Sequence, residues 1–257
     1  IERAGYIAHS MSKGYQNKLA KTKALIASHP DYAVSASWGK DSGVMLHIAA
    51  QVHGDLLVVN GRFNNSNERV FDSDKVRDVM LARDDMSSVE YIEIEVMGEW
   101  EMFEMAGEAF TTPITDEHKK AFKAWQDDFT NKMTDAVTSR GRVGTFVGLR
   151  QDESNNRRMN IAMRGDDYTK ADGSRICLPI ARWSGLDVWA YIVTHDLPYL
   201  PFYDNSIFGR ERARSEFIFG STIANTAKRH GVWEDWKLNY PNEFNAWMTR
   251  FPELQKV

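Results

Sequence analysis

The feature that most constrains the fold is a β-prone segment that leads through a small-residue turn directly into an amphipathic helix. The β-prone segment covers residues 32–36, and the helix is predicted to begin near Asp41. The first backbone N–H groups of such a helix have no intrahelical partner, and the helix macrodipole adds partial positive charge there. Because phosphate oxygens accept such hydrogen bonds and carry negative charge, the segment predicts a phosphate-binding loop.

The residues of the turn suit phosphate in several ways. Gly39 lets the backbone approach a ligand without an intervening Cβ, and Lys40 supplies a mobile cation. The hydroxyl groups of Ser37 and Ser42 can donate hydrogen bonds. The simpler alternative is an ordinary helix start, because Asp41 and Ser42 are common N-cap residues. The turn contains neither the Walker pattern nor the Gly-x-Gly-x-x-Gly pattern of dinucleotide-binding proteins.

The six residues from Ser37 to Ser42 resemble the Ser-x-Gly-x-Asp-Ser loop of the adenine nucleotide α-hydrolases, also called PP-loop ATP pyrophosphatases. This superfamily includes the sulfate adenylyltransferase small subunit, phosphoadenylyl-sulfate (PAPS) reductase and FAD synthetase, and the loop is most similar to the first. The resemblance implies that ATP binds with Mg²⁺ and that Asp41 lies at the metal. The implied nucleotide contacts within this segment are Ser35, Ser37, Trp38, Gly39 and Ser42.

A second informative segment covers residues 143–158. A predicted strand ends at Gly148, and Arg150 follows at the end where parallel α/β sheets bind ligands. Arg157 and Arg158 lie on the helix predicted next. Three arginines suit a polyphosphate, because guanidinium groups bind phosphate bidentately; alternatively, the last two pair with neighbouring acids on a solvated helix face. The segment resembles the family's Gly-x-Arg-x-Asp-Glu-x-x-x-Arg motif, which implies a nucleotide site that includes Gly148.

A third similarity lies at residues 175–192, which follow the family's Pro-Ile-x-x-Trp-Ser-x-x-Asp-Val-Trp order. Ser184 is predicted to cap a helix there. Earlier in the chain, the apolar run at residues 56–60 predicts a strand buried on both faces. Asn60 ends this strand where the family usually has an Asp near the ribose or adenine, and the alternative reading is an ordinary turn residue.

Three matches in the family's order, spread over residues 35–204, identify the chain as a member of the PAPS reductase and sulfate adenylyltransferase small-subunit family. The resemblance implies an α/β fold with a parallel twisted sheet flanked by helices, of Rossmann-like type. We expect residues 1–10 to be a tail and residues 11–204 to form the nucleotide-binding domain. A helical insertion is expected at about residues 98–140, and a helical C-terminal extension at residues 205–257.

The insertion and the extension carry less specific signals. Aromatic residues recur at helical spacing in the insertion, which favours either a cover over the substrate pocket or a dimer contact. Arg210, Arg212 and Arg214 form a basic cluster that could hold an anionic substrate or simply begin a solvated helix. The aromatic residues that follow are predicted to dock the extension onto the core.

The composition limits partners and redox chemistry. With a net charge of -4 and a pI near 6.0, the chain has no general affinity for nucleic acid or an anionic membrane. No apolar run reaches the roughly 20 residues of a membrane span, so we expect a cytoplasmic protein. The single cysteine, Cys177, leaves no Cys-x-x-Cys pair and no cysteine-held iron–sulfur cluster in this chain, and it is predicted to be a buried, inert thiol.

The predicted activity is cleavage of ATP between its α- and β-phosphates, with transfer of the adenylyl group to an acceptor that the sequence does not identify. Lys40 and Ser42 are predicted to hold pyrophosphate, and Arg150 with Arg157 or Arg158 to meet the charge on the transferred group. Two alternatives stay open. One is a PAPS reductase-like enzyme that lacks its own catalytic cysteine and uses a partner's thiol. The other is a non-catalytic nucleotide-binding subunit, in a homodimer or with a partner subunit.

Overall fold

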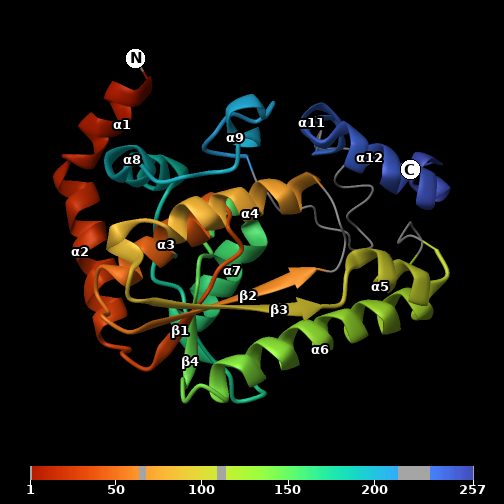
Figure 1. Cartoon of the computed structure of the whole chain (residues 1–257), viewed down its shortest axis with the longest axis horizontal. Coiled ribbons are helices and arrows are strands. Elements are labelled where there is room, and N and C mark those ends of the chain that lie inside the picture. Colours follow the sequence, from red (N-terminus) through yellow and green to blue (C-terminus); the bar gives the residue numbers. More distant parts are fainter. Residues whose placement is uncertain (1, 64–67, 109–113, 214–231, 257) are drawn as a thin grey trace.

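The computed structural model describes residues 2–63, 68–108, 114–213 and 232–256, and within them six strands form one sheet in the order β3-β2-β1-β4-β6-β5 (Figure 1). Neighbouring strands are parallel except for the antiparallel β5–β6 pair. The strands are β1 Tyr32–Ser35, β2 Leu56–Phe63, β3 Val89–Val96, β4 Gly144–Val147, β5 Asp167–Thr169 and β6 Arg175–Cys177. The predicted α/β fold with a mostly parallel sheet is therefore confirmed.

The central strands form from the apolar runs of the sequence. Side chains on both faces of β1 and β2 are fully buried, including Ala33, Val34, Leu57 and Val58. In the parallel register, Val34 pairs with Val58 of β2 on one side and with Phe146 of β4 on the other. A strand that is buried on both faces needs helices above and below it.

Helices supply that cover on both faces (Figure 1). Helices α3 and α8 share one core with Val34 and Val58, whereas α6 packs Met133 and Val137 against Leu57 on the opposite face. None of the described helices combines the length and the apolar character needed to cross a membrane. The α-helices are α1 Glu2–Ser10, α2 Lys13–Ala27, α3 Lys40–Ala50, α4 Glu68–Leu81, α5 Glu99–Ala106, α6 Asp116–Thr138, α7 Asn155–Arg164, α8 Gly185–His195, α9 Phe202–Asn205, α11 Val232–Asn239 and α12 Pro241–Arg250, and the 3-10 turns are η1 Asp84–Met86, η2 Gln151–Glu153 and η3 Pro252–Lys256.

Residues 2–10 form helix α1, where a tail was expected. Tyr6 is buried, and its ring stacks on Trp189 of α8 with the ring centroids 6.3 Å apart. His9 and Lys18 contact the two carboxylate oxygens of Asp187 in α8, at 2.8 and 2.6 Å. Asp187 is buried, so these contacts give its charge the partners it requires. They also fix α1 and α2 to α8.

The aromatic residues of the C-terminal helices dock onto the core, as predicted. Trp247 of α12 meets Phe103 of α5 and Trp236 of α11, with ring centroids 5.7 and 6.0 Å apart. The predicted basic cluster does not act as one group. Arg210 pairs with Asp204 at 2.6 Å, Arg212 is exposed, and Arg214 lies outside the described residues.

Two helical side chains are placed against their polarity. Val79 of α4 is apolar but 57% exposed. His47 of α3 is polar but buried, and it is bonded on both ring nitrogens. Its Nδ1 lies 2.8 Å from the Tyr191 hydroxyl and its Nε2 lies 3.0 Å from the Asp85 carboxylate. Since a carboxylate only accepts, Nε2 carries the proton and Nδ1 accepts from the hydroxyl, which fits a neutral imidazole.

Candidate nucleotide site

The predicted loop lies where the strand order of the sheet reverses. From β1 the chain continues to β2 and β3 on one side, and it then returns to β4 on the other side of β1. Ligands of open α/β sheets bind at such a switch point, beyond the carboxyl ends of the strands. Ser35, the last residue of β1, pairs with Val147 of β4. The segments that follow these two strands therefore start side by side.

Gly148 brings the end of β4 against the first turn of α3. A Cβ atom at this position would lie 2.8 Å from Cα and 2.9 Å from the backbone N of Ser42. Both neighbours are backbone atoms, so a side chain could fit only if one of the two segments moved. The glycine predicted from the motif is thus required for the approach of Arg150 to α3.

Hydrogen bonds of Ser42 close the loop on itself. Its Oγ accepts from the Ser37 N–H at 3.2 Å and donates to the Gly39 carbonyl at 3.1 Å, while the two serine Oγ atoms are 3.1 Å apart. Gly39 occupies the N-cap position of α3 in an extended conformation. The two predicted hydroxyl groups therefore lie together, directly before the first N–H groups of the helix.

The side chains of Trp38 and Asn60 connect the loop to neighbouring parts of the sheet. Trp38 has a left-handed backbone conformation, with φ 58°, which is uncommon for a bulky residue. Its side chain is buried and meets Tyr91 of β3 edge to face, with centroids 5.6 Å apart. Asn60 was expected to end its strand, but it lies inside β2, which stays paired with β3 as far as Phe63. It donates from Nδ2 to the carbonyl of Ala36 at 2.6 Å, which joins β2 to the start of the loop. Both side chains thus support the loop, and a contact with a nucleotide stays a prediction.

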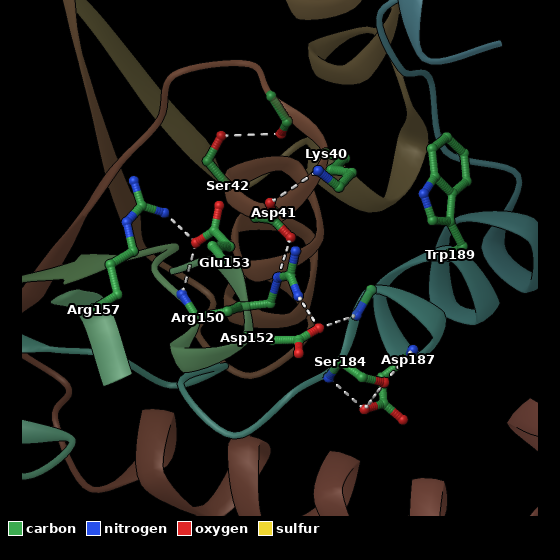
Figure 2. Close-up of polar contacts among 12 residues, drawn as sticks. Lys40, Asp41, Ser42, Arg150, Asp152, Glu153, Arg157, Ser184, Asp187 and Trp189 are labelled. Atoms are coloured by element: carbon green, nitrogen blue, oxygen red, sulfur yellow. Dashed lines mark hydrogen bonds and ion pairs between the residues drawn. The ribbon is translucent and has the colours of Figure 1, made fainter. Parts of the chain in front are cut away.

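The side chains of Lys40 and Arg150 both contact the Asp41 carboxylate at the first turn of α3 (Figure 2). Arg150 donates from Nε to Asp41 Oδ1 at 2.6 Å, and Lys40 Nζ lies 3.4 Å from Asp41 Oδ2. All three residues are buried. Burial lowers the pKa of Lys40, against the opposing charge of Asp41. Burial alone would raise the pKa of Asp41, but the charges of Lys40 and Arg150 outweigh it, so that pKa is lowered and the carboxylate stays ionised.

Two further carboxylates hold the arginines, and sequence reasoning did not place them in the site. Asp152 Oδ2 lies 3.4 Å from Arg150 Nη1 and accepts from the N–H of Gly185, the first residue of α8, at 3.2 Å. Glu153 accepts from the backbone N–H of Arg150 at 3.0 Å and also pairs with the guanidinium of Arg157. The acidic pair inside the Gly-x-Arg-x-Asp-Glu motif was the available signal.

The two arginines of α7 have different positions. Arg157 pairs with Glu153, as the alternative reading expected, but the two side chains are only 18 and 7% exposed, so this pair does not lie on a solvated helix face. Arg158 is exposed on the outer side of the helix. Ser154 caps α7 by accepting from the Arg157 N–H at 3.2 Å. The structure therefore brings Arg150 and Arg157 to the loop and leaves Arg158 outside.

The residues at the loop do not fit the expected role in binding Mg²⁺. Each oxygen of Asp41 already lies against a cation, Arg150 on one side and Lys40 on the other. Mg²⁺ requires octahedral oxygen ligands and is repelled by neighbouring cations. Among the described residues, no group of three or more His, Cys, Asp or Glu side chains could hold a metal ion. We therefore infer that the Asp41 carboxylate pairs with Arg150 and Lys40 and does not bind Mg²⁺.

Cys177 lies in β6 and is a free, buried thiol. Burial raises its pKa to about 12, with the charges of Asp167 and Asp166 adding to the effect. At neutral pH it is therefore protonated and a poor nucleophile. The prediction of a buried thiol in a strand is confirmed, and its lack of reactivity stays a prediction.

An open, mostly parallel sheet with a phosphate-type loop at its switch point defines an α/β protein of the nucleotide-binding class. The family model of the phosphoadenosine phosphosulfate reductase domain matches residues 31–209, and the chain belongs to this family. The matched range begins just before β1, ends after α9 and contains every site residue predicted from the sequence.

Individual proteins agree with this assignment. Phosphoadenosine 5'-phosphosulfate reductase of Xylella fastidiosa (strain M23) is 27% identical over 184 residues, which are 68% of this chain and 68% of that protein. Sulfate adenylyltransferase subunit 2 of Rhizobium tropici is 29% identical over 181 residues, 65% of this chain and 55% of that protein. A crystal structure of PAPS reductase from Candida auris, in a phosphate complex, has a similar fold, with a TM-score of 0.50 and 12% identity over 76% of this chain and 93% of that one.

Proposed function

We propose that the chain binds ATP at the loop after β1 and cleaves it between the α- and β-phosphates. An acceptor attacks the α-phosphorus, the bond from this phosphorus to the bridging oxygen breaks, and pyrophosphate leaves with the electron pair. The N-terminus of α3 and the hydroxyl groups of Ser37 and Ser42 hold the pyrophosphate. Such a reaction depends on positioning and on electrostatic stabilisation, so it needs no nucleophile from the protein.

The observation that carries the proposal is the pair of buried cations at the first turn of α3. Lys40 and Arg150 lie on either side of Asp41, directly behind the loop. Little water surrounds them, so their charges act more strongly on a nearby phosphate than charges on the surface would. Arg157 adds a third cation when a phosphate oxygen competes with Glu153 for its guanidinium, a group that can bind phosphate bidentately.

A second candidate function is reduction of PAPS, supported by the family and by the names of its relatives. PAPS is also an adenine nucleotide and uses the same loop in this reading. The thiol has to come from outside residues 1–257, for example from a partner, because Cys177 is buried in the sheet and has a raised pKa. This candidate requires PAPS to bind more tightly than ATP and requires an added dithiol for turnover.

The test is release of pyrophosphate and AMP from ATP with Mg²⁺, with water as the default acceptor and PAPS as a competitor. Lys40→Ala is expected to lower release by about 10²–10³-fold, the range seen when one group that stabilises the transition state is removed. Lys119→Ala is the matched control, because Lys119 is an exposed lysine on α6, with a side chain 67% exposed. It is expected to match the wild type.

The other outcomes select the alternatives. Release that survives Lys40→Ala in a folded protein contradicts the assigned roles. PAPS binding at least tenfold tighter than ATP binding, with sulfite formed only when dithiol is added, favours the reductase. Tight ATP binding without release, until a partner protein is added, favours a nucleotide-binding subunit.

A further inference from the structure

The ammonium group of Lys40 is enclosed by a distant part of the chain. Nζ donates to the carbonyl of Ala213 at 2.5 Å, and it lies 4.8 Å from the centroid of the Tyr203 ring. Together with the Asp41 carboxylate, these groups leave Lys40 only 3% exposed. The position of this charge is therefore set by the segment after α8, which follows the loop by more than 160 residues.

Tyr203 contacts both the backbone and the side chain of Lys40. Its hydroxyl accepts from the backbone N–H of Lys40 at 3.2 Å, while its ring faces the ammonium. The Lys40 N–H is the first of helix α3, and it is one of the donors that a helix N-terminus offers to an anion. One side chain thus occupies a phosphate donor of the loop and also holds the cation beside it.

Tyr203 is itself held firmly. It is 2% exposed in the short helix α9, and its ring meets Trp189 of α8 edge to face with centroids 5.7 Å apart. The same helix α8 begins at Gly185, whose N–H bonds to Asp152, the partner of Arg150. Both buried cations of the candidate site are therefore positioned from α8, one through Tyr203 and the other through Asp152.

We propose that Tyr203 is a positioning residue that fixes where the Lys40 charge stands relative to the phosphates, an inference that rests on the proposed function. The ring holds the ammonium by a cation–π contact that is shielded from water, and the hydroxyl holds the backbone at the first turn of α3. Bound phosphate competes with the hydroxyl for the Lys40 N–H. Loss of the ring therefore moves the charge, whereas loss of the hydroxyl only frees the amide.

The direct test measures how fast an acylating reagent, N-hydroxysuccinimide acetate, labels Lys40, with peptides quantified by mass spectrometry. The exposed Lys119 in the same sample is the internal reference. In the wild type Lys40 is expected to stay nearly unlabelled. Tyr203→Leu is expected to speed its labelling at least about tenfold, and Tyr203→Phe, which keeps the ring, to change it less than about threefold.

Tyr199→Leu is the matched control. Tyr199 also packs edge-on against Trp189, with centroids 4.9 Å apart, but its ring lies next to Arg210. The proposal is wrong if Lys40 in folded Tyr203→Leu reacts no faster than Lys40 in Tyr199→Leu. If Tyr203→Leu does not fold, Tyr203→Phe decides by hydrogen exchange, since the Lys40 amide should exchange about tenfold faster without its acceptor, and an unchanged rate overturns the proposal.

Kinetics separate this inference from the proposed function. With ATP, kcat is expected to fall about 100-fold in Tyr203→Leu and to change less than about threefold in Tyr203→Phe, which keeps the ring, while KM changes less than about threefold in both. A purely structural role would instead lower the amount of folded protein. If the wild type neither binds nor cleaves ATP, the proposed function is wrong. The labelling experiment still tests whether the Tyr203 ring holds the Lys40 ammonium. An active wild type with unchanged kcat in Tyr203→Leu overturns the positioning role alone.

Discussion

Two clusters near the carboxyl edge of the sheet both pair cations with carboxylates, but they differ in their contact with water. In the first, the side chains of Lys40, Asp41 and Arg150 are 1, 12 and 2% exposed. In the second, arginines of β2 and α4 pair with carboxylates of α4 and β3, and their side chains are between 18 and 36% exposed. The members of this second cluster are Arg62, Asp74, Arg77 and Glu93.

The difference shows which charges the fold depends on. Every member of the buried cluster has left water, so removal of one partner leaves a charge that neither water nor protein compensates, at a cost of about 3–5 kcal/mol. Water and salt screen the second cluster, where each pair contributes about 0.2–1 kcal/mol. We therefore expect the residues of the proposed site to stabilise the fold as well.

The largest effect is expected for Arg150→Met, which removes one partner of the buried cluster. We expect the free energy of unfolding in urea to fall by about 3–5 kcal/mol, because Asp41 loses its shortest contact with a cation. Adding Asp41→Asn should increase the loss, since the buried Lys40 ammonium then has no carboxylate partner in the cluster. A loss below about 1 kcal/mol for Arg150→Met, or a double variant as stable as the wild type, would contradict this view of the cluster.

Gly148→Ala tests whether the buried cluster depends on the close approach of β4 to α3. The new Cβ would stand within 3 Å of the Ser42 backbone, so we expect a loss of about 2 kcal/mol in the free energy of unfolding. Gly14→Ala in α2 is the control, because nothing lies within 4 Å of that position and alanine favours a helix. The control should be neutral or slightly stabilising. Equal free energies of unfolding for the two variants would show that the contact between β4 and α3 can accommodate a side chain at little cost.

His47 is buried and its partner Asp85 is partly exposed, with side chains 2 and 36% exposed. This pair should make the free energy of unfolding depend on pH. Burial lowers the pKa of His47, so below its ordinary value of about 6.5 the unfolded chain binds a proton that the folded chain does not. The contribution of His47 is thus complete above that value and is lost as the pH falls through it. Between pH 7.5 and 5.5 we expect the free energy of unfolding, measured with urea, to fall by roughly 1 kcal/mol more in the wild type than in His47→Gln. Parallel pH profiles of the two proteins would refute this.

The smallest effect is expected for Arg62→Ala in the second cluster. Asp74 and Glu93 both keep Arg77 as a partner and stay in contact with water. The free energy of unfolding should therefore fall by less than about 1 kcal/mol, and by still less in 1 M salt, which screens such pairs. A loss as large as that of Arg150→Met would remove the distinction between the two clusters.

Local sequence patterns predicted the elements that carry the site. The apolar run before the loop, the helix start near Asp41, the cap at Ser184 and the buried thiol at Cys177 each depend on a few neighbouring residues. Hydrophobic period and capping chemistry report such local preferences directly. The order of the motifs then fixed the family, and through it the mostly parallel sheet.

Contacts between distant segments could not be predicted in the same way. The burial of His47 depends on Tyr191, 144 residues later, and the acceptor at Asp152 serves a backbone N–H at the start of α8. Helix α1 looked like a tail because the ring on which its docking residue Tyr6 stacks, that of Trp189, lies in the distant helix α8. No periodicity within one segment says which other segment will lie against it, so these contacts needed the structure.

The separation between Lys40 and Ala213 also has a consequence for synthesis of the chain. A ribosome adds about 5–20 residues per second, so the 173 residues between donor and acceptor take roughly 9–35 s to make. During that time β1, β2 and β3 can already pair, while the first turn of α3 still lacks Arg150, Tyr203 and the carbonyl that receives the lysine. The nascent protein can therefore pair the first half of its sheet early and completes the proposed nucleotide site late, and a chain that stalls before residue 203 holds the loop without Tyr203 and Ala213, which position the Lys40 charge.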